Sequence, residues 1–251
     1  MRRGGSIRLR GGVLAAVLVT VFFGTAGMAL AETNRWAFQY QPSSANERWG
    51  VRGWLMGTNP NIPSDHLDDR CVNVTLWLRA EMSGTQPWVE IGFFSGVAQS
   101  TSPPYTNQPT LYKAYNTTGL DADYDERAWG TIGIGSLHKV AFQRTDHNTE
   151  GETRWDFYFD GDNLTHNWLP APDLGHAEAG GEIYTFDGTW PSMLAKARDN
   201  GSGEANRMCI HVASGSWTEW NTSYTTATQE STGTAFDAFA PKWSNFNATD
   251  D

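Results

Sequence analysis

The sequence is poor in cysteine and lacks the short motifs that mark the common metal, cofactor and serine enzymes. Its 251 residues contain only two cysteines, Cys71 and Cys209. No C-x-x-C or H-E-x-x-H motif occurs, which disfavours metal enzymes of the common types. The G-x-S-x-G elbow that presents a serine nucleophile is also missing. We therefore expect neither a metal nor a cofactor.

Basic residues are scarce as well. The chain holds 18 Lys and Arg against 28 Asp and Glu, a formal net charge of −10. Four of the arginines and no acidic residue lie in residues 1–31, so the rest carries 14 basic residues (18 minus 4) and a net charge of −14. Such a surface repels nucleic acid and anionic lipid, because binding to phosphate needs the opposite sign. We expect no nucleic-acid partner.

The first 31 residues have the three parts of a secretory signal peptide. Four arginines make a positive start, residues 13–23 are apolar, and Ala29-Leu30-Ala31 is an A-x-A cleavage site. The apolar stretch has about half of the roughly 20 residues that a membrane-spanning helix needs. An uncleaved N-terminal anchor is the alternative. We predict a secreted, extracellular protein of residues 32–251, with no membrane association after signal cleavage.

Residues 32–251 consist mainly of short alternating runs separated by Gly, Pro, Asn and Asp, a pattern typical of antiparallel sandwiches and barrels. This length fits one domain. The sequence predicts one short helix, Pro191–Asp199, and a tight turn at Asp160-Gly161. The fold class is therefore an all-β antiparallel β-sandwich of jelly-roll type in a single domain. The predicted strands are Cys71–Met82, Trp88–Phe94, Leu111–Thr117, His138–Arg144, Arg154–Asp160, Glu182–Phe186 and Arg207–Ala213.

The two cysteines both lie in predicted strands. In an oxidising compartment we expect a Cys71–Cys209 disulfide. Such a bridge closes a long loop and contributes on the order of 4 to 5 kcal/mol in the chain-entropy model. The alternative is two buried free thiols.

One predicted strand, Trp88–Phe94, carries a single charged residue among apolar ones. Alternation puts its apolar positions on the core side and Trp88, Glu90 and Gly92 on the outer side. Gly92 has no side chain and is expected to leave open space beside Glu90. Glu90 is therefore a candidate for chemistry on the outer face of a sheet, although a plain surface carboxylate fits the pattern too.

A second glutamate, Glu182, follows Gly180-Gly181 at the start of another predicted strand. Glycine at such a point allows a backbone or a ligand to approach closely. In jelly-roll folds the outer face of one sheet is often concave, and aromatic side chains on it form a groove. Ordinary sheet packing is the alternative for each aromatic. The residues expected to line this groove and bind substrate are Trp77, Trp88, Tyr112 and Tyr115.

The segments around both glutamates resemble the two catalytic blocks of the neprosin-type glutamic endopeptidases. WVEIGFF at Trp88–Phe94, the polar loop after it and PTLYKAYNT at Pro109–Thr117 are similar to the first block. AGGEIY at Ala179–Tyr184 is similar to the second block. More distantly, the layout is similar to fungal glutamic peptidases, which use a Gln/Glu pair. The resemblance implies a β-sandwich peptidase whose catalytic residues are Glu90 and Glu182.

The mechanism that the resemblance implies needs no metal. Two carboxyl groups close together cannot both ionise cheaply, so one stays protonated and the other ionised. The ionised carboxylate takes a proton from water and the protonated one donates to the substrate. Activity is then expected to peak at acid pH, with a polypeptide as substrate.

Two other functions fit the sequence. One is a non-catalytic secreted β-sandwich that binds polysaccharide or another cell-surface ligand through exposed aromatics, since the chain has 12 tryptophans. The other is a secreted glycosidase with a carboxylate pair. Convergence of the Glu90 and Glu182 carboxyls in one groove favours the peptidase, and carboxyls that lie far apart or on different faces exclude it.

Overall fold

The computed structural model describes residues in 14 segments, and the predicted signal peptide, residues 1–31, lies outside them. Residues 31–251 form one compact unit. The described residues form strands, turns and loops and contain no α-helix. Accordingly, no helix among them could cross a membrane. The segments are 33–41, 48–57, 62–68, 70–79, 87–97, 105–118, 123–170, 176–185, 193–197, 209–212, 215–219, 227–230, 238–242 and 245–250.

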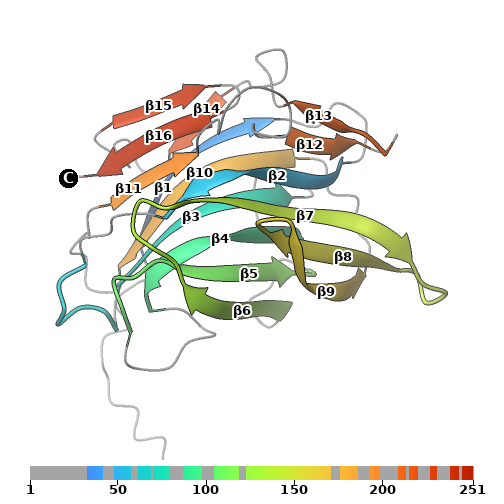
Figure 1. The fold of residues 1–251 in the computed structure, drawn as a ribbon, viewed down its shortest axis with the longest axis horizontal. Helices are drawn as coiled ribbons and strands as arrows, with labels where there is room; N and C mark the ends of the chain where they lie inside the picture. The colour runs from blue at the N-terminus through green and yellow to red at the C-terminus, as the bar shows by residue number, and fades with distance from the viewer. Residues whose placement is uncertain are drawn as a thin grey trace, which may run out of the picture. The chain divides into compact units, whose positions relative to one another are not determined.

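One antiparallel sheet has seven strands in the order β14-β1-β10-β3-β4-β5-β6 (Figure 1). Strands β3 to β6 are consecutive neighbours, whereas β10 inserts between β1 and β3 from much later in the chain. The strands are β1 (Thr33–Gln41), β3 (Arg70–Arg79), β4 (Trp88–Gly96), β5 (Thr110–Asn116), β6 (Tyr124–Thr131), β10 (His176–Thr185) and β14 (Ala227–Glu230).

The second antiparallel sheet follows the order β15-β16-β11-β2-β7-β8-β9, and β12 pairs with both β2 and β13. Figure 1 shows β7, β8 and β9 as successive hairpins on the right of the view. The strands are β2 (Arg48–Met56), β7 (Leu137–His147), β8 (Glu152–Phe159), β9 (Asp162–Pro170), β11 (Met193–Ala197), β12 (Cys209–Val212), β13 (Trp217–Glu219), β15 (Ala238–Lys242) and β16 (Asn245–Asp250).

The hydrophobic core lies between the sheets, where alternate residues of each strand meet. In β3 every second side chain from Val72 to Leu78 is fully buried, and Phe142 and Phe157 of the other sheet join the same cluster. Full burial of such a side chain contributes about 1.5 to 3 kcal/mol. The other face of β3, which carries Asn73, Thr75 and Trp77, is turned away from this core and is called the outer face below.

The predicted all-β antiparallel sandwich of jelly-roll type is confirmed. The Asp160-Gly161 turn is also confirmed: both residues have positive φ, 50° and 97°, which suits a two-residue hairpin between β8 and β9. The strand predicted from Glu182 in fact begins at His176, so its glycines lie inside β10.

The predicted helix Pro191–Asp199 is wrong. Met193–Ala197 forms strand β11, which pairs with β16 along its whole length and with β2 at its end. These residues favour a helix locally, but strand pairing with segments far away in the chain outweighs a local propensity of a few tenths of a kcal/mol per residue.

The predicted Cys71–Cys209 disulfide does not form, and both cysteines are thiols. Cys71 precedes buried Val72 in β3 and therefore lies on the outer face of the seven-stranded sheet. Cys209 pairs across strands with Arg52, on the side of the second sheet away from the core, and an Arg52 nitrogen lies 3.8 Å from its sulfur. Two stacked sheets about 10 Å apart thus separate the thiols, beyond the reach of a disulfide.

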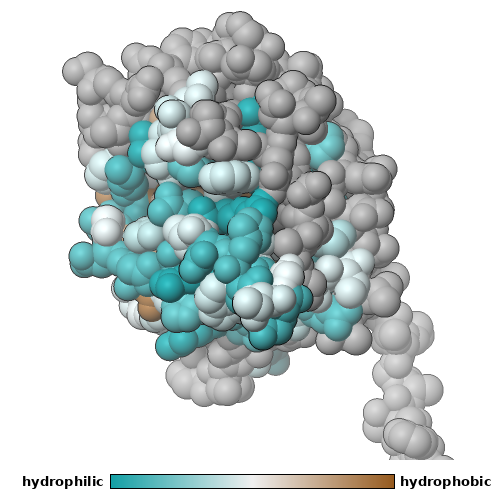
Figure 2. All heavy atoms as spheres, turned by 90° about the vertical axis from the view of Figure 1, so that its right-hand side faces the viewer, coloured by the Kyte–Doolittle hydropathy of each residue, from teal (hydrophilic) through white to brown (hydrophobic). Residues whose placement is uncertain are grey.

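Large hydrophobic side chains are rarely exposed among the described residues. Figure 2 shows one side of the molecule on which the coloured residues are mostly hydrophilic. Ile134 and Trp168 are the large hydrophobic residues that reach solvent in the described part of the chain. This side therefore offers no continuous apolar surface.

Candidate active site

The two predicted catalytic glutamates both lie on the outer face of the seven-stranded sheet, on strands that are separated by one strand, β3. The register of β10, β3, β4, β5 and β6 sets their residues in rows across the sheet. One row contains Glu178, Trp77, Glu90, Ala114 and Glu126. A second contains Glu182, Asn73, Phe94 and Thr110.

The row between these two consists largely of small residues: Gly180, Thr75, Gly92, Tyr112 and Ala128. Glu90 and Glu182 therefore flank a strip of the sheet with little side-chain bulk. The space predicted beside Gly92 is nevertheless wrong in detail. A Cβ on Gly92 would lie 2.1 Å from the carbonyl oxygen of Val74, so this glycine is needed for the close approach of β4 to β3.

Glu90 on β4 is a buried carboxyl with an exposed fraction of 4%, and its Oε2 makes no hydrogen bond to any described residue. Burial raises the pKa of Glu90 well above its usual range, and the hydroxyl of Tyr112 partly offsets this. The negative charge of Glu182 raises the pKa of Glu90 further. The protonated form of Glu90 is thus favoured.

Glu182 on β10 is equally buried, with an exposed fraction of 2%. Its Oε2 accepts a hydrogen bond of 3.3 Å from the side-chain amide of Asn73, its cross-strand partner on β3. The donor fixes the carboxylate on the outer face and stabilises its ionised form.

The sequence prediction missed a third carboxyl on this face. Glu178 is 1% exposed and lies 3.6 Å from a guanidinium nitrogen of Arg79. Burial, the largest effect, raises the pKa of Glu178 to about 7 although Arg79 lowers it. Alternation was the available signal, because Glu178 and Glu182 stand four residues apart and so share a face of one strand.

Three of the four predicted substrate-binding aromatics lie on the outer face. Trp77 and Trp88 stack with ring centroids 6.0 Å apart, and Tyr112 packs edge-on against Phe94 at 5.3 Å. Arg79 lies over the ring of Trp77. These rings cover the sheet on both sides of Glu90.

The placement of Tyr115 with these aromatics is wrong. Tyr115 stands three residues after Tyr112, so it points to the core side of β5, where Lys113 Nζ lies 4.3 Å from its ring centre. Its hydroxyl accepts a hydrogen bond of 3.5 Å from Asn167 of the other sheet. Tyr115 therefore packs between the sheets and cannot contact a substrate on the outer face.

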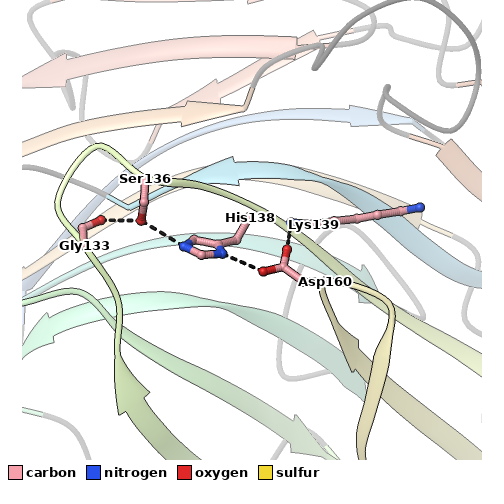
Figure 3. Close-up of polar contacts among 5 residues, drawn as sticks. All are labelled: Gly133, Ser136, His138, Lys139 and Asp160. Atoms are coloured by element: carbon pink, nitrogen blue, oxygen red, sulfur yellow. Dashed lines mark hydrogen bonds and ion pairs between the residues drawn. The ribbon is translucent and has the colours of Figure 1, made fainter.

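A serine, histidine and aspartate also come together away from this face (Figure 3). His138 lies 2.9 Å from the hydroxyl of Ser136 and 2.8 Å from the carboxyl of Asp160. However, the Ser136 hydroxyl donates to the carbonyl of Gly133. The backbone N–H groups of Gly135 and Ser136 donate to carbonyls, which leaves neither for an oxyanion. This cluster fastens two turns and does not match a serine hydrolase.

No three His, Cys, Asp or Glu side chains within the described segments are grouped as a metal site requires.

Two solved structures with a similar fold are peptidases. Scytalido-glutamic peptidase, solved with a peptide-based transition state analog, is 10% identical with a TM-score of 0.56, and the match covers 86% of this chain and 98% of that one. SCP-B, a member of the eqolisin family of peptidases solved with the tripeptide Ala-Ile-His, is 10% identical with a TM-score of 0.55 and the same coverage. At this identity the likeness shows a shared fold. A likeness to glutamic peptidases is thus found at the level of fold, and the neprosin type stays a prediction.

No protein-family model matches the chain, and no curated protein matches it.

Proposed function

We propose that this protein is a secreted glutamic peptidase that hydrolyses polypeptides with Glu90 and Glu182 as its catalytic pair. The observation that carries the proposal is the placement of two buried carboxyls on one sheet face, two strands apart and on either side of a strip of small residues, where the charge of Glu182 raises the pKa of Glu90. The fold shared with glutamic peptidases supports it.

We propose a role for each carboxyl from its surroundings. Glu182 accepts a hydrogen bond from Asn73 and acts as the ionised base, which takes a proton from water. The water oxygen then bonds to the carbonyl carbon of the substrate. Glu90, whose pKa is raised chiefly by burial, acts as the acid. It gives its proton to the leaving amine as the C–N bond breaks, and the proton on Glu182 returns to Glu90 before the next cycle.

The test is cleavage of a denatured protein at about pH 4, where a carboxyl pair holds one proton. Glu90→Ala and Glu182→Gln should each lower kcat by at least about 100-fold, the lower end of the contribution of general acid–base catalysis. Alanine is chosen at position 90 because glutamine there would recreate the Gln/Glu pair of fungal glutamic peptidases. Glu150→Gln, at an exposed turn between β7 and β8, is the matched control and should cleave normally. Undiminished cleavage by either dyad variant contradicts the proposal.

The stacked pair Trp77 and Trp88 favours a second candidate function, the binding of polysaccharide or another cell-surface ligand through aromatic rings. The same preparation distinguishes the two. A binding protein stays on insoluble polysaccharide in a pull-down and leaves the denatured protein uncut, and replacing Trp88 with alanine releases it.

A further inference from the structure

The hydroxyl of Tyr112 is a buried donor without a hydrogen bond of normal geometry to any described residue, although it lies near enough to Glu90 and Thr75 to interact with both. Tyr112 has an exposed fraction of 2%, and its phenolic oxygen makes no hydrogen bond to a described residue. A buried polar group without a partner costs about 1 to 3 kcal/mol, so native structures rarely keep one without a reason. Other tyrosines nearby are committed, since Tyr124 donates to Glu126 and Tyr115 accepts from Asn167.

The hydroxyl of Tyr112 lies beside the carboxyl of Glu90. Tyr112 and Glu90 are near enough that each changes the pKa of the other, and Oε2 of Glu90 is likewise without a hydrogen bond. Gly92 lies between Tyr112 and Thr75 in the central row of the face, and because it has no side chain the Tyr112 hydroxyl can approach both Thr75 and Glu90. Two buried polar atoms without partners at one place mark the position of a polar ligand atom.

We infer that Tyr112 is a further catalytic residue, whose O–H donates a hydrogen bond to the carbonyl oxygen of the scissile peptide bond as that oxygen becomes negative. This inference rests on the proposed function. A peptide carbonyl suits this position, because its oxygen has lone pairs that can accept a hydrogen bond from the Tyr112 O–H.

The proton inventory of the step is complete without further reagents. Attack by water moves the electrons of the C=O double bond onto oxygen, where Tyr112 stabilises the charge and keeps its own proton. Burial raises the pKa of Tyr112 well above its usual value, so the phenol remains a donor. When the carbonyl re-forms, the C–N bond breaks and the amine takes its proton from Glu90.

The experiment compares Tyr112→Phe with Tyr115→Phe, which removes the same hydroxyl three residues along β5 on the opposite face. For Tyr112→Phe we expect kcat to fall by about 100-fold with little change in KM, the usual effect of losing one oxyanion donor. Its thermal midpoint should stay the same or rise, because the variant removes an unpaired buried hydroxyl. Tyr115→Phe should keep its kcat.

The outcomes separate this role from the function on which it rests. A wild-type enzyme that cleaves, together with an equally active Tyr112→Phe variant, overturns the role of Tyr112 and leaves the glutamate pair standing. A Tyr112→Phe variant that loses thermal stability along with kcat assigns the hydroxyl a structural role and also overturns the inference. A wild-type protein without cleavage removes the proposed function, and the role of Tyr112 with it.

Discussion

Burial affects the pKa values of Glu90 and Glu178 on the outer face more than their charged neighbours do. Glu178 shows this most clearly, because its pKa is raised to about 7 although Arg79 lies 3.6 Å away. Removing a carboxylate from water costs more than one guanidinium at this distance returns. The pKa of Glu90 is raised chiefly by burial as well. A single substitution on this face therefore acts mainly through solvation and space.

Gly92 is the residue where space is tightest. Gly92→Ala places a Cβ 2.1 Å from the carbonyl oxygen of Val74 and 2.8 Å from the Cα of Thr75, both backbone atoms. We expect the free energy of unfolding to fall by at least about 1 to 3 kcal/mol, the cost of overpacking, as measured by urea denaturation. Gly130→Ala is the matched control, because a Cβ there meets no atom within 4 Å. Equal stability of both variants refutes this explanation of Gly92.

At the scale of strands and turns, the cluster in Figure 3 ties the loop before β7 to the turn between β8 and β9. Asp160 accepts hydrogen bonds from the backbone N–H of Lys139 at 2.8 Å and from His138 at 2.8 Å. It does so with a φ of 50°, a conformation that Asp and Asn tolerate better than other residues with a side chain.

Asp160→Ala should therefore destabilise the protein by about 1 to 2 kcal/mol, through two lost hydrogen bonds and a strained backbone. Asp160→Asn keeps an acceptor for Lys139 and tolerates the same φ, so it should lose less. Thermal unfolding of the two variants gives the comparison, and an alanine variant as stable as the asparagine variant contradicts the account.

Alternation predicted the strands and faces that position the site, and it failed where distant pairing decides. It placed Trp77, Trp88 and Glu90 on one face correctly. Tyr115 was misplaced although the same two-residue period, applied from Tyr112, puts it on the core side. Strand β11 was unpredictable locally, since its partners β2 and β16 lie far off in sequence. Whether Cys71 and Cys209 can form a disulfide depends on which sheet each strand joins, and their spacing in the sequence does not reveal this.

For the whole molecule, the carboxyls whose pKa is raised on folding link the stability of the fold to pH. Between the ordinary value of 4.5 and about 7, folded Glu178 holds a proton that the unfolded chain has released. Folding therefore takes up protons in this range, and stability falls as pH rises. The raised pKa of Glu90 acts in the same direction. Both groups favour the folded state most below the ordinary carboxyl pKa of 4.5, and this stability is lost as pH rises through the raised pKa of the folded protein.

We expect the urea midpoint of the wild-type protein to fall from about pH 5 to about pH 8. Glu178→Gln, which cannot titrate, should make this dependence shallower. Glu150→Gln, at an exposed turn, should leave it as in the wild type. An unchanged slope in Glu178→Gln excludes Glu178 as one of the linked groups.

The pairing of β3 with β10 also determines when the outer face can form during synthesis. Asn73 and Glu182, joined by a hydrogen bond, are 109 residues apart in the chain. Contacts of such sequence separation form slowly, because chain entropy must be lost before they are made. A ribosome has to synthesise β10 before Glu182 can sit opposite β4, so an incomplete chain carries Glu90 on a sheet without its partner carboxyl. The pair of carboxyls therefore cannot assemble until β10, which ends at Thr185 of the 251 residues, has been synthesised.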